Sequence, residues 1–383
     1  MSELDLKALR GQIDGIDRQI VQLYRERMDC ALKIGAWKRE RGLPVLDTER
    51  ERELLNRVGD LAGEENASEV RALFSLLMAR SRSRQLLAGR PAGELGKRIR
   101  AAMESTDPLF PARATVACQG VEGAYSQIAC ERIFQAPSIM YFRNFESVFS
   151  AIETGLCRYG ILPIENSLAG SVSGVYDQMI SHHFHIVRAA RIKIDHALLV
   201  RPGTRPDQIG EVFSHEQAIQ QCSGFLAKHK DWRINICSNT AAAARQVAES
   251  GRNDVAAISS GVCAALYGLE RVEGEIQNNS NNHTRFICIS KEPEIYPGAD
   301  HTSLMLVLPN RPGSLYQLLG QFNARGINLS KLESRPMPGR DFEFMFYFDM
   351  DASVYAPDFV RLIEELDATL DQFSYLGSYS EIV

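Results

Sequence analysis

The sequence lacks any apolar run of about 18 residues, and its N-terminus is polar. We therefore expect no membrane span, no membrane partner and no secretion signal, which favours a cytoplasmic protein. The formal net charge is −5. This charge argues against a general nucleic-acid binder, because such proteins concentrate positive charge.

Metal-binding spacings are also lacking. The eight cysteines are scattered without a CxxC pair, and the histidines form no HxxxH pair. Most of the cysteines lie in apolar-periodic contexts, which predicts reduced thiols in the core. The two glycines of "GVEGAYS" do not fit the GxGxxG or GK[ST] phosphate-binding spacings. We expect neither a metal nor another cofactor.

The chain has 383 residues, 45% of them hydrophobic and 24% charged. This length exceeds one ordinary core and predicts two or three globular domains. In residues 1–88, apolar residues recur at three- and four-residue steps. The pattern predicts a first helix that ends near 41–44, a second after Asp47 and a third over about 68–87. Glycine and proline then cluster in residues 89–113, which predicts a linker.

The pattern changes at residue 114. Over 114–290, short apolar runs alternate with helical patterns, which predicts an α/β domain with parallel or mixed sheets. A polar bridge, 291–300, leads to residues 301–383. Their βαββαβ order predicts a ferredoxin-like α+β unit.

Three cations of the first predicted helix pose a geometric problem. Arg27 and Lys38 are about three turns apart and point to the same side, but Arg10 lies roughly 25 Å from Arg27 along the axis. The three cannot converge on one small molecule within one straight helix. An antiparallel second copy could deliver its own Arg10 to the other two. Alternatively, each is a solvated charge on a helical bundle.

After the turn, one face of the second predicted helix carries Asp47, Arg50 and Glu51, and one face of the third carries Ser81 and Gln85. Together with the three cations, this set resembles the chorismate mutase of the all-helical class, an intertwined dimer. The resemblance implies that the chain rearranges chorismate, a dicarboxylate, to prephenate in one pericyclic step. Such a step needs only a bound reactive conformer and stabilised charge.

The resemblance also implies residue roles in the mutase. Arg27 and Arg10 of a second copy would bind the carboxylates. Lys38 and Gln85 would donate to the breaking ether oxygen. The other matched positions would contact the ring hydroxyl or support the carboxylates: Asp47, Arg50, Glu51 and Ser81.

Several predicted strands of the α/β region end in a small polar residue just before a helix. Each such residue can simply cap its helix. Collected at one sheet edge, however, the helix N-termini would also bind a small anion. The stretches "GVEGAYS", "ILPIENSLAGSV", "SHEQAIQQC" and "HTRF" resemble prephenate dehydratase. This family has a two-lobed fold similar to periplasmic binding proteins, with the active site between the lobes.

The implied reaction removes the ring hydroxyl as water and one carboxylate as carbon dioxide, giving phenylpyruvate. It needs a proton donor near the leaving hydroxyl but no metal. By resemblance, Thr284 is the catalytic donor. Glu216 stands where many relatives carry proline, which affects the expected loop shape. Seven further residues match substrate-binding positions: Glu165, Asn166, Ser167, Ser214, Gln221, Arg285 and Phe286.

The C-terminal stretches "RPGSLYQLLGQF" and "ESRP" resemble the ACT regulatory domain. The resemblance implies that L-phenylalanine, as an inhibitor, binds between two paired ACT domains. A glycine at the strand-to-helix turn permits close backbone approach there. The matched positions are Pro312, Gly313, Ser314, Leu315, Glu333, Ser334 and Arg335.

Together these resemblances imply a bifunctional chorismate mutase–prephenate dehydratase that is inhibited by phenylalanine and forms a homodimer or higher homo-oligomer. Three alternatives remain open. The mutase segment could serve only dimerisation, the chain could be a non-enzymatic sensor of small anions or amino acids, or the dehydratase could prefer arogenate.

Overall fold

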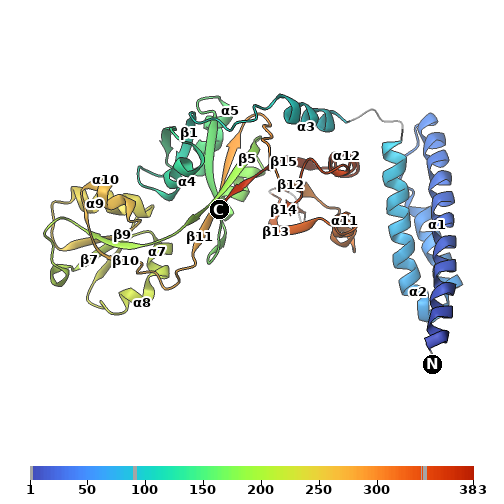
Figure 1. Cartoon of the computed structure of the whole chain (residues 1–383), viewed down its shortest axis with the longest axis horizontal. Coiled ribbons are helices and arrows are strands. Elements are labelled where there is room, and N and C mark those ends of the chain that lie inside the picture. Colours follow the sequence, from blue (N-terminus) through green and yellow to red (C-terminus); the bar gives the residue numbers. More distant parts are fainter. Residues whose placement is uncertain (1–2, 89–92, 338, 340–342) are drawn as a thin grey trace. The chain divides into compact units, whose positions relative to one another are not determined.

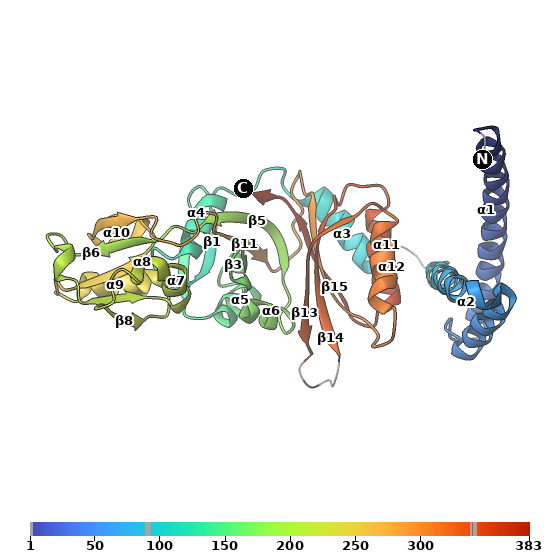
Figure 2. The same ribbon diagram turned by 90° about the horizontal axis from the view of Figure 1, so that it is seen from below.

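The computed structural model describes residues 3–88, 93–337, 339 and 343–383. The chain divides into two compact units. Figures 1 and 2 show its helices and strands coloured along the sequence. One unit comprises residues 1–97, 308–326 and 360–373, and the other comprises 98–307, 327–359 and 374–383. In the described part of the chain, no helix is both long and apolar enough to cross a membrane.

Two long helices, α1 (Glu3–Glu40) and α2 (Thr48–Leu87), pack against each other. The carboxylate of Asp47 caps α2 by accepting a hydrogen bond from the backbone N–H of Arg50 at 3.0 Å. Two helices were predicted after Asp47, and α2 consists of two helical segments that meet at a kink. The helix is interrupted only at Gly63, whose φ of 75° is readily adopted by glycine.

The predicted linker contains a helix, α3 (Glu94–Ser105). Its apolar residues Ile99 and Ala102 lie three positions apart, and both are buried. Flanking glycine and proline residues dominated the sequence pattern, so this short amphipathic helix was missed. Residues 89–92 of the predicted linker lie outside the described residues.

The first lobe of the α/β region contains a mixed seven-stranded sheet in the order β16-β5-β11-β3-β1-β2, with β4 beside β3. β1 runs parallel to β2 and β3, whereas β11 lies antiparallel between β3 and β5. The elements are β1 (Thr115–Gln119), α4 (Tyr125–Ile133), β2 (Ser138–Phe142), α5 (Phe145–Glu153), β3 (Tyr159–Asn166), β4 (Gly170–Ser171), α6 (Ser173–Met179), β5 (His185–Lys193), β11 (His283–Ser290) and β16 (Glu381–Ile382).

The second lobe contains a five-stranded sheet in the order β10-β6-β9-β7-β8. β7 is parallel to β8 and β9, and β6 is antiparallel to β9 and β10. The elements are β6 (Ala197–Val200), η1 (Pro206–Gln208), β7 (Glu211–Ser214), α7 (Glu216–Gln221), α8 (Ser223–Leu226), β8 (Arg233–Ile236), α9 (Thr240–Glu249), β9 (Val255–Ser259), α10 (Val262–Tyr267) and β10 (Glu270–Gly274).

The C-terminal region has the element order β12-α11-β13-β14-α12-β15, and its sheet order is β13-β14-β12-β15. The last strand, β16, then pairs with β5, so residues 381–382 complete the sheet of the first lobe. The elements are β12 (His301–Val307), α11 (Ser314–Asn323), β13 (Asn328–Pro336), β14 (Phe344–Asp351), α12 (Phe359–Thr369) and β15 (Phe373–Tyr379).

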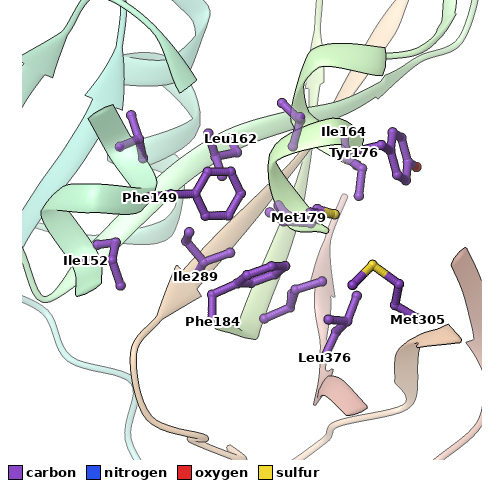
Figure 3. Close-up of a cluster of buried hydrophobic side chains, with 14 of the residues drawn as sticks. Phe149, Ile152, Leu162, Ile164, Tyr176, Met179, Phe184, Ile289, Met305 and Leu376 are labelled. Atoms are coloured by element: carbon purple, nitrogen blue, oxygen red, sulfur yellow. The ribbon is translucent and has the colours of Figure 1, made fainter. Parts of the chain in front are cut away.

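One hydrophobic core joins the C-terminal sheet to the first lobe. Met305 of β12 and Leu376 of β15 belong to the same buried cluster as Phe184 and Ile289 (Figure 3). Burying one such side chain contributes about 1.5–3 kcal/mol. The strands of the C-terminal sheet are therefore part of the folded second unit.

Candidate active sites

The helix pair brings several predicted mutase residues together. Nη1 of Arg27 donates to Oγ of Ser81 at 2.6 Å and to the carbonyl of Leu77 at 3.1 Å. Burial lowers the pKa of Arg27 from its ordinary value. Further along the pair, a Cβ on Gly35 would lie 2.8 Å from Cγ of Gln85. The two helices are thus in close contact one turn before Lys38.

The remaining mutase residues have local partners. Nζ of Lys38 donates to the carbonyl of Val45 at 2.8 Å. Glu51 forms an ion pair with Arg82. Asp47 caps α2, and Arg50 pairs with Glu53 at 3.2 Å. Arg10 is exposed on the N-terminal part of α1.

An apolar strip lies exposed along the same helix. Ile13, Ile16 and Ile20 are each more than half exposed, and Leu23 is 63% exposed. An apolar surface of this kind normally marks a contact with another protein surface. The strip lies on α1, the helix that also carries Arg10 and Arg27.

A cavity of about 520 Å³ lies between the two α/β lobes. Four residues predicted for the dehydratase site line it: Asn166, Gln221, Thr284 and Phe286. The first lobe also contributes Tyr125 and Ser126, and the second lobe contributes His215, Gln217 and Thr240. Polar groups from both lobes therefore converge on one apolar-walled space, as in small-molecule sites.

The Thr284 hydroxyl is fixed by a neighbouring strand. Nδ2 of Asn166 lies 3.0 Å from Oγ1 of Thr284, and the two residues are paired across β3 and β11. Oδ1 of Asn166 accepts hydrogen bonds from the backbone N–H groups of Leu168 and Ala169, at 3.1 and 2.9 Å. A backbone N–H can only donate, so the amide orientation is determined and Nδ2 must donate to Thr284.

A histidine that the sequence did not indicate also lines the cavity. His196 is 2% exposed, and its Nε2 lies 2.9 Å from Oε1 of Gln221. Burial lowers the pKa of His196, which keeps the imidazole neutral at neutral pH. Burial likewise raises the pKa of Tyr125, so its hydroxyl stays protonated. The apolar run that follows His196 predicts a core strand, and nothing in that pattern indicates that the histidine lines a cavity.

Four other predicted residues lie outside the lining of this cavity. Glu165 of β3 is paired with Arg285 of β11. Glu165 directly precedes Asn166 in the sequence, and Arg285 directly follows Thr284. Successive residues of a strand point to opposite faces, so these two side chains point away from the cavity. Ser214 is buried and donates to the carbonyl of Ile258 at 2.7 Å.

The opposite face meets the C-terminal sheet. Nζ of Lys331 on β13 lies 2.7 Å from Oε1 of Glu165. Arg285 forms ion pairs with Asp349 of β14 and, at 2.7 Å, with Glu381. Ser167, the fourth residue, lines a second cavity of about 790 Å³ together with Glu165 and Arg285.

The residues predicted to bind phenylalanine fall into two groups. In the first, residues 312–315, Gly313 has a φ of 83° and precedes α11, and the buried Oγ of Ser314 has no hydrogen-bond partner among the described residues. The second group, residues 333–335, lies on β13. There Glu333 accepts a hydrogen bond from Ser171 at 2.6 Å, and Arg335 pairs with Asp177 at 2.7 Å.

The helix pair and the two-lobed domain define a protein with two separate enzyme modules. Residues 9–86 match the family model of chorismate mutase type II, and residues 116–294 match that of prephenate dehydratase. The chain belongs to the family of bifunctional chorismate mutase/prephenate dehydratases, enzymes of phenylalanine biosynthesis.

Three similar proteins illustrate this membership. The bifunctional chorismate mutase/prephenate dehydratase of Escherichia coli K12 is 31% identical, over 99% of this chain and 97% of its own. The chloroplastic arogenate dehydratase/prephenate dehydratase 2 of Arabidopsis thaliana is 38% identical, over 70% and 73%. The crystal structure of prephenate dehydratase from Arthrobacter aurescens in complex with L-Phe is 28% identical with a TM-score of 0.64, over 70% of this chain and 90% of that one.

Proposed function

We propose that this chain converts chorismate to prephenate on the helix pair and prephenate to phenylpyruvate in the cavity between the lobes, with L-phenylalanine as inhibitor. The observation that carries the second activity is the Thr284 hydroxyl, which lines the cavity and accepts a hydrogen bond from Asn166. The cavity volume of about 520 Å³ is in the range of small-molecule sites.

In the dehydratase reaction, the C–C bond to one carboxylate breaks and its electron pair enters the ring as carbon dioxide leaves. The C–O bond to the ring hydroxyl breaks with its own electron pair, and the oxygen takes a proton to leave as water. Among the described residues, none accepts a hydrogen bond from the Thr284 hydroxyl, so its proton is available to the leaving oxygen. A neutral hydroxyl is a weak acid, so Thr284 acts mainly by orienting and hydrogen-bonding that oxygen.

For the mutase, Arg27 binds a carboxylate, and Lys38 and Gln85 donate to the ether oxygen. Support comes from the Arg27–Ser81 hydrogen bond, and from Gln85, which is buried on α2 beside Gly35 of α1. The exposed apolar strip on α1 supports a second copy of the chain as the source of Arg10. The functional form is then at least a homodimer.

For regulation, the C-terminal region acts as an ACT domain. Its βαββαβ element order supports this assignment, as does the left-handed Gly313 at the start of α11. The related Arthrobacter aurescens dehydratase forms a complex with L-Phe. Free N–H groups at a helix start can bind the carboxylate of an amino acid.

Replacing Thr284 by alanine tests the dehydratase assignment. We expect Thr284→Ala to lower dehydratase kcat by about 10² to 10⁴, the usual contribution of a positioned proton donor, and to leave mutase activity unchanged. Phenylpyruvate formation and chorismate loss are measured on the same preparation, with arogenate as a second substrate. Thr284→Ser restores a hydroxyl and serves as the control. Undiminished dehydration by Thr284→Ala would contradict the assignment.

A further inference from the structure

The polar stretch before β11 contains Asn282, which nothing so far assigns. Asn282 is fully buried, and its Oδ1 lies 2.8 Å from Nδ2 of Asn166. Since Nδ2 of Asn166 must donate, the Asn282 atom that it meets must be the oxygen. The orientation of the Asn282 amide is therefore determined as well.

The side-chain amide of Asn166 has two N–H groups that can donate hydrogen bonds. One is directed to Oδ1 of Asn282, and the other to Oγ1 of Thr284 at 3.0 Å. A third acceptor, the carbonyl of His283, is more distant at 3.3 Å. With its oxygen fixed by two backbone N–H groups and one N–H fixed by Asn282, the Asn166 amide has a single orientation. Its remaining N–H is then aligned with Thr284.

This arrangement determines the direction of the Thr284 proton. Oγ1 of Thr284 accepts from Asn166, so its own hydrogen cannot point toward that amide. We propose that Asn282 is a positioning residue for the dehydratase: through Asn166 it holds the Thr284 hydroxyl with its proton directed to the substrate. This inference rests on the proposed role of Thr284 as the donor to the leaving oxygen.

A purely structural role would predict a different hydrogen-bond pattern. A buried amide kept for stability normally has all its polar groups satisfied. Nδ2 of Asn282 is buried, yet it has no hydrogen-bond partner among the described residues. Replacing the amide by an apolar group of the same size removes this unsatisfied donor but leaves one N–H of Asn166 with only the more distant carbonyl of His283 as acceptor. We therefore expect a modest fall in melting temperature and no loss of mutase activity.

The variant Asn282→Leu keeps the side-chain size and removes the acceptor oxygen. We expect dehydratase kcat to fall about 10- to 100-fold, because small misplacement of a reacting group has effects of that size. KM should stay within about threefold and mutase activity should be unchanged. Asn282→Ala should give the same kcat loss and serves if the leucine variant does not fold.

Two variants act as matched controls. Asn282→Asp keeps an oxygen for Asn166, so its kcat should stay within about threefold of wild type, while its added negative charge raises KM for a dicarboxylate. Asn281→Leu alters the neighbouring exposed side chain and should leave both kinetic constants unchanged.

The double variant Asn166→Leu/Asn282→Leu separates an indirect role from an independent one. If Asn282 acts through Asn166, the double variant loses no more kcat than Asn166→Leu alone. Losses that multiply would overturn the inference. So would a normal kcat for Asn282→Leu, or an equal loss of dehydratase and mutase activities with a lowered melting temperature.

Thr284→Ala distinguishes this inference from the proposed function. If Thr284→Ala is inactive and Asn282→Leu is normal, the positioning role alone is wrong. If Thr284→Ala keeps its dehydratase activity, the proposed function of Thr284 fails, and the inference fails with it.

Discussion

The two candidate sites differ in how their walls are built. Arg27 and Lys38 lie on α1, the helix that carries the exposed apolar strip. Arg10 lies on the same helix, far from both. Thr284 and Asn166, in contrast, are buried, and residues of both lobes line the cavity beside them. A two-helix hairpin has too few surfaces to enclose a small molecule, whereas two sheets with their helices can do so. We therefore expect the first site to need a second copy of the chain, and the second site to be complete within one chain.

The largest expected effect tests this difference directly. Arg10→Ala and Lys38→Ala should each lower mutase activity at least about 100-fold, since each removes a preorganised charge. After unfolding and refolding of an equal mixture, roughly a quarter of the activity should return. Half of the dimers are then mixed, and each mixed dimer has one intact site.

The corresponding mixture for the dehydratase is Thr284→Ala with Gln221→Ala. Both residues line one cavity of one chain, so no dehydratase activity should return. Recovery of dehydratase activity would contradict a site built by one chain. Absence of mutase recovery would contradict a site shared between two chains.

A matched pair of glycine substitutions gives an intermediate effect. A Cβ on Gly160 would lie 2.9 Å from Cγ1 of Val148 inside the first lobe, so Gly160→Ala should destabilise the dehydratase by about 1–3 kcal/mol. Gly35→Ala should separate α1 from α2 near Gln85 and reduce only the mutase. Gly11→Ala, on the same helix but with open space around it, is the control. Thermal denaturation and both activities are measured, and equal effects of Gly35→Ala and Gly11→Ala would contradict the proposed contact.

The smallest expected effect concerns the inhibitor. L-phenylalanine at ten times its Kd should stabilise the folded state by about 1.4 kcal/mol. Scanning calorimetry measures this shift as a rise in melting temperature. D-phenylalanine is the control. No shift at millimolar L-phenylalanine would argue against a regulatory site.

Sequence patterns predicted the strands of the α/β region well where the strands are short and apolar. β2 (Ser138–Phe142) and β9 (Val255–Ser259) coincide with short apolar runs of this kind. β5 is harder to predict from the sequence, because Arg188 and Arg191 interrupt its apolar pattern. α3 was missed because glycine and proline surround it. In both cases the burial of a few apolar side chains outweighs the local composition.

The candidate residues show the same limit. The motif around Thr284 and Arg285 was visible in the sequence, and strand alternation requires that the two point to opposite faces. The residues that contact the candidate site residues in the folded chain could not be predicted from the sequence. No sequence motif marks His196, Asn282 or Lys331. Each contacts a candidate site residue that is distant in the sequence: Gln221, Asn166 and Glu165, respectively.

The sequence by itself determined the helical character of residues 1–88, the α/β region and the residue types at both candidate sites, because periodicity and local motifs depend on near neighbours. Only the tertiary structure decided which face of β11 meets the cavity. That choice follows from the pairing of β11 between β3 and β5, which aligns Thr284 with Asn166 and Arg285 with Glu165. A shift of one residue would exchange the two faces, and the register depends on burial across the whole sheet rather than on the motif itself.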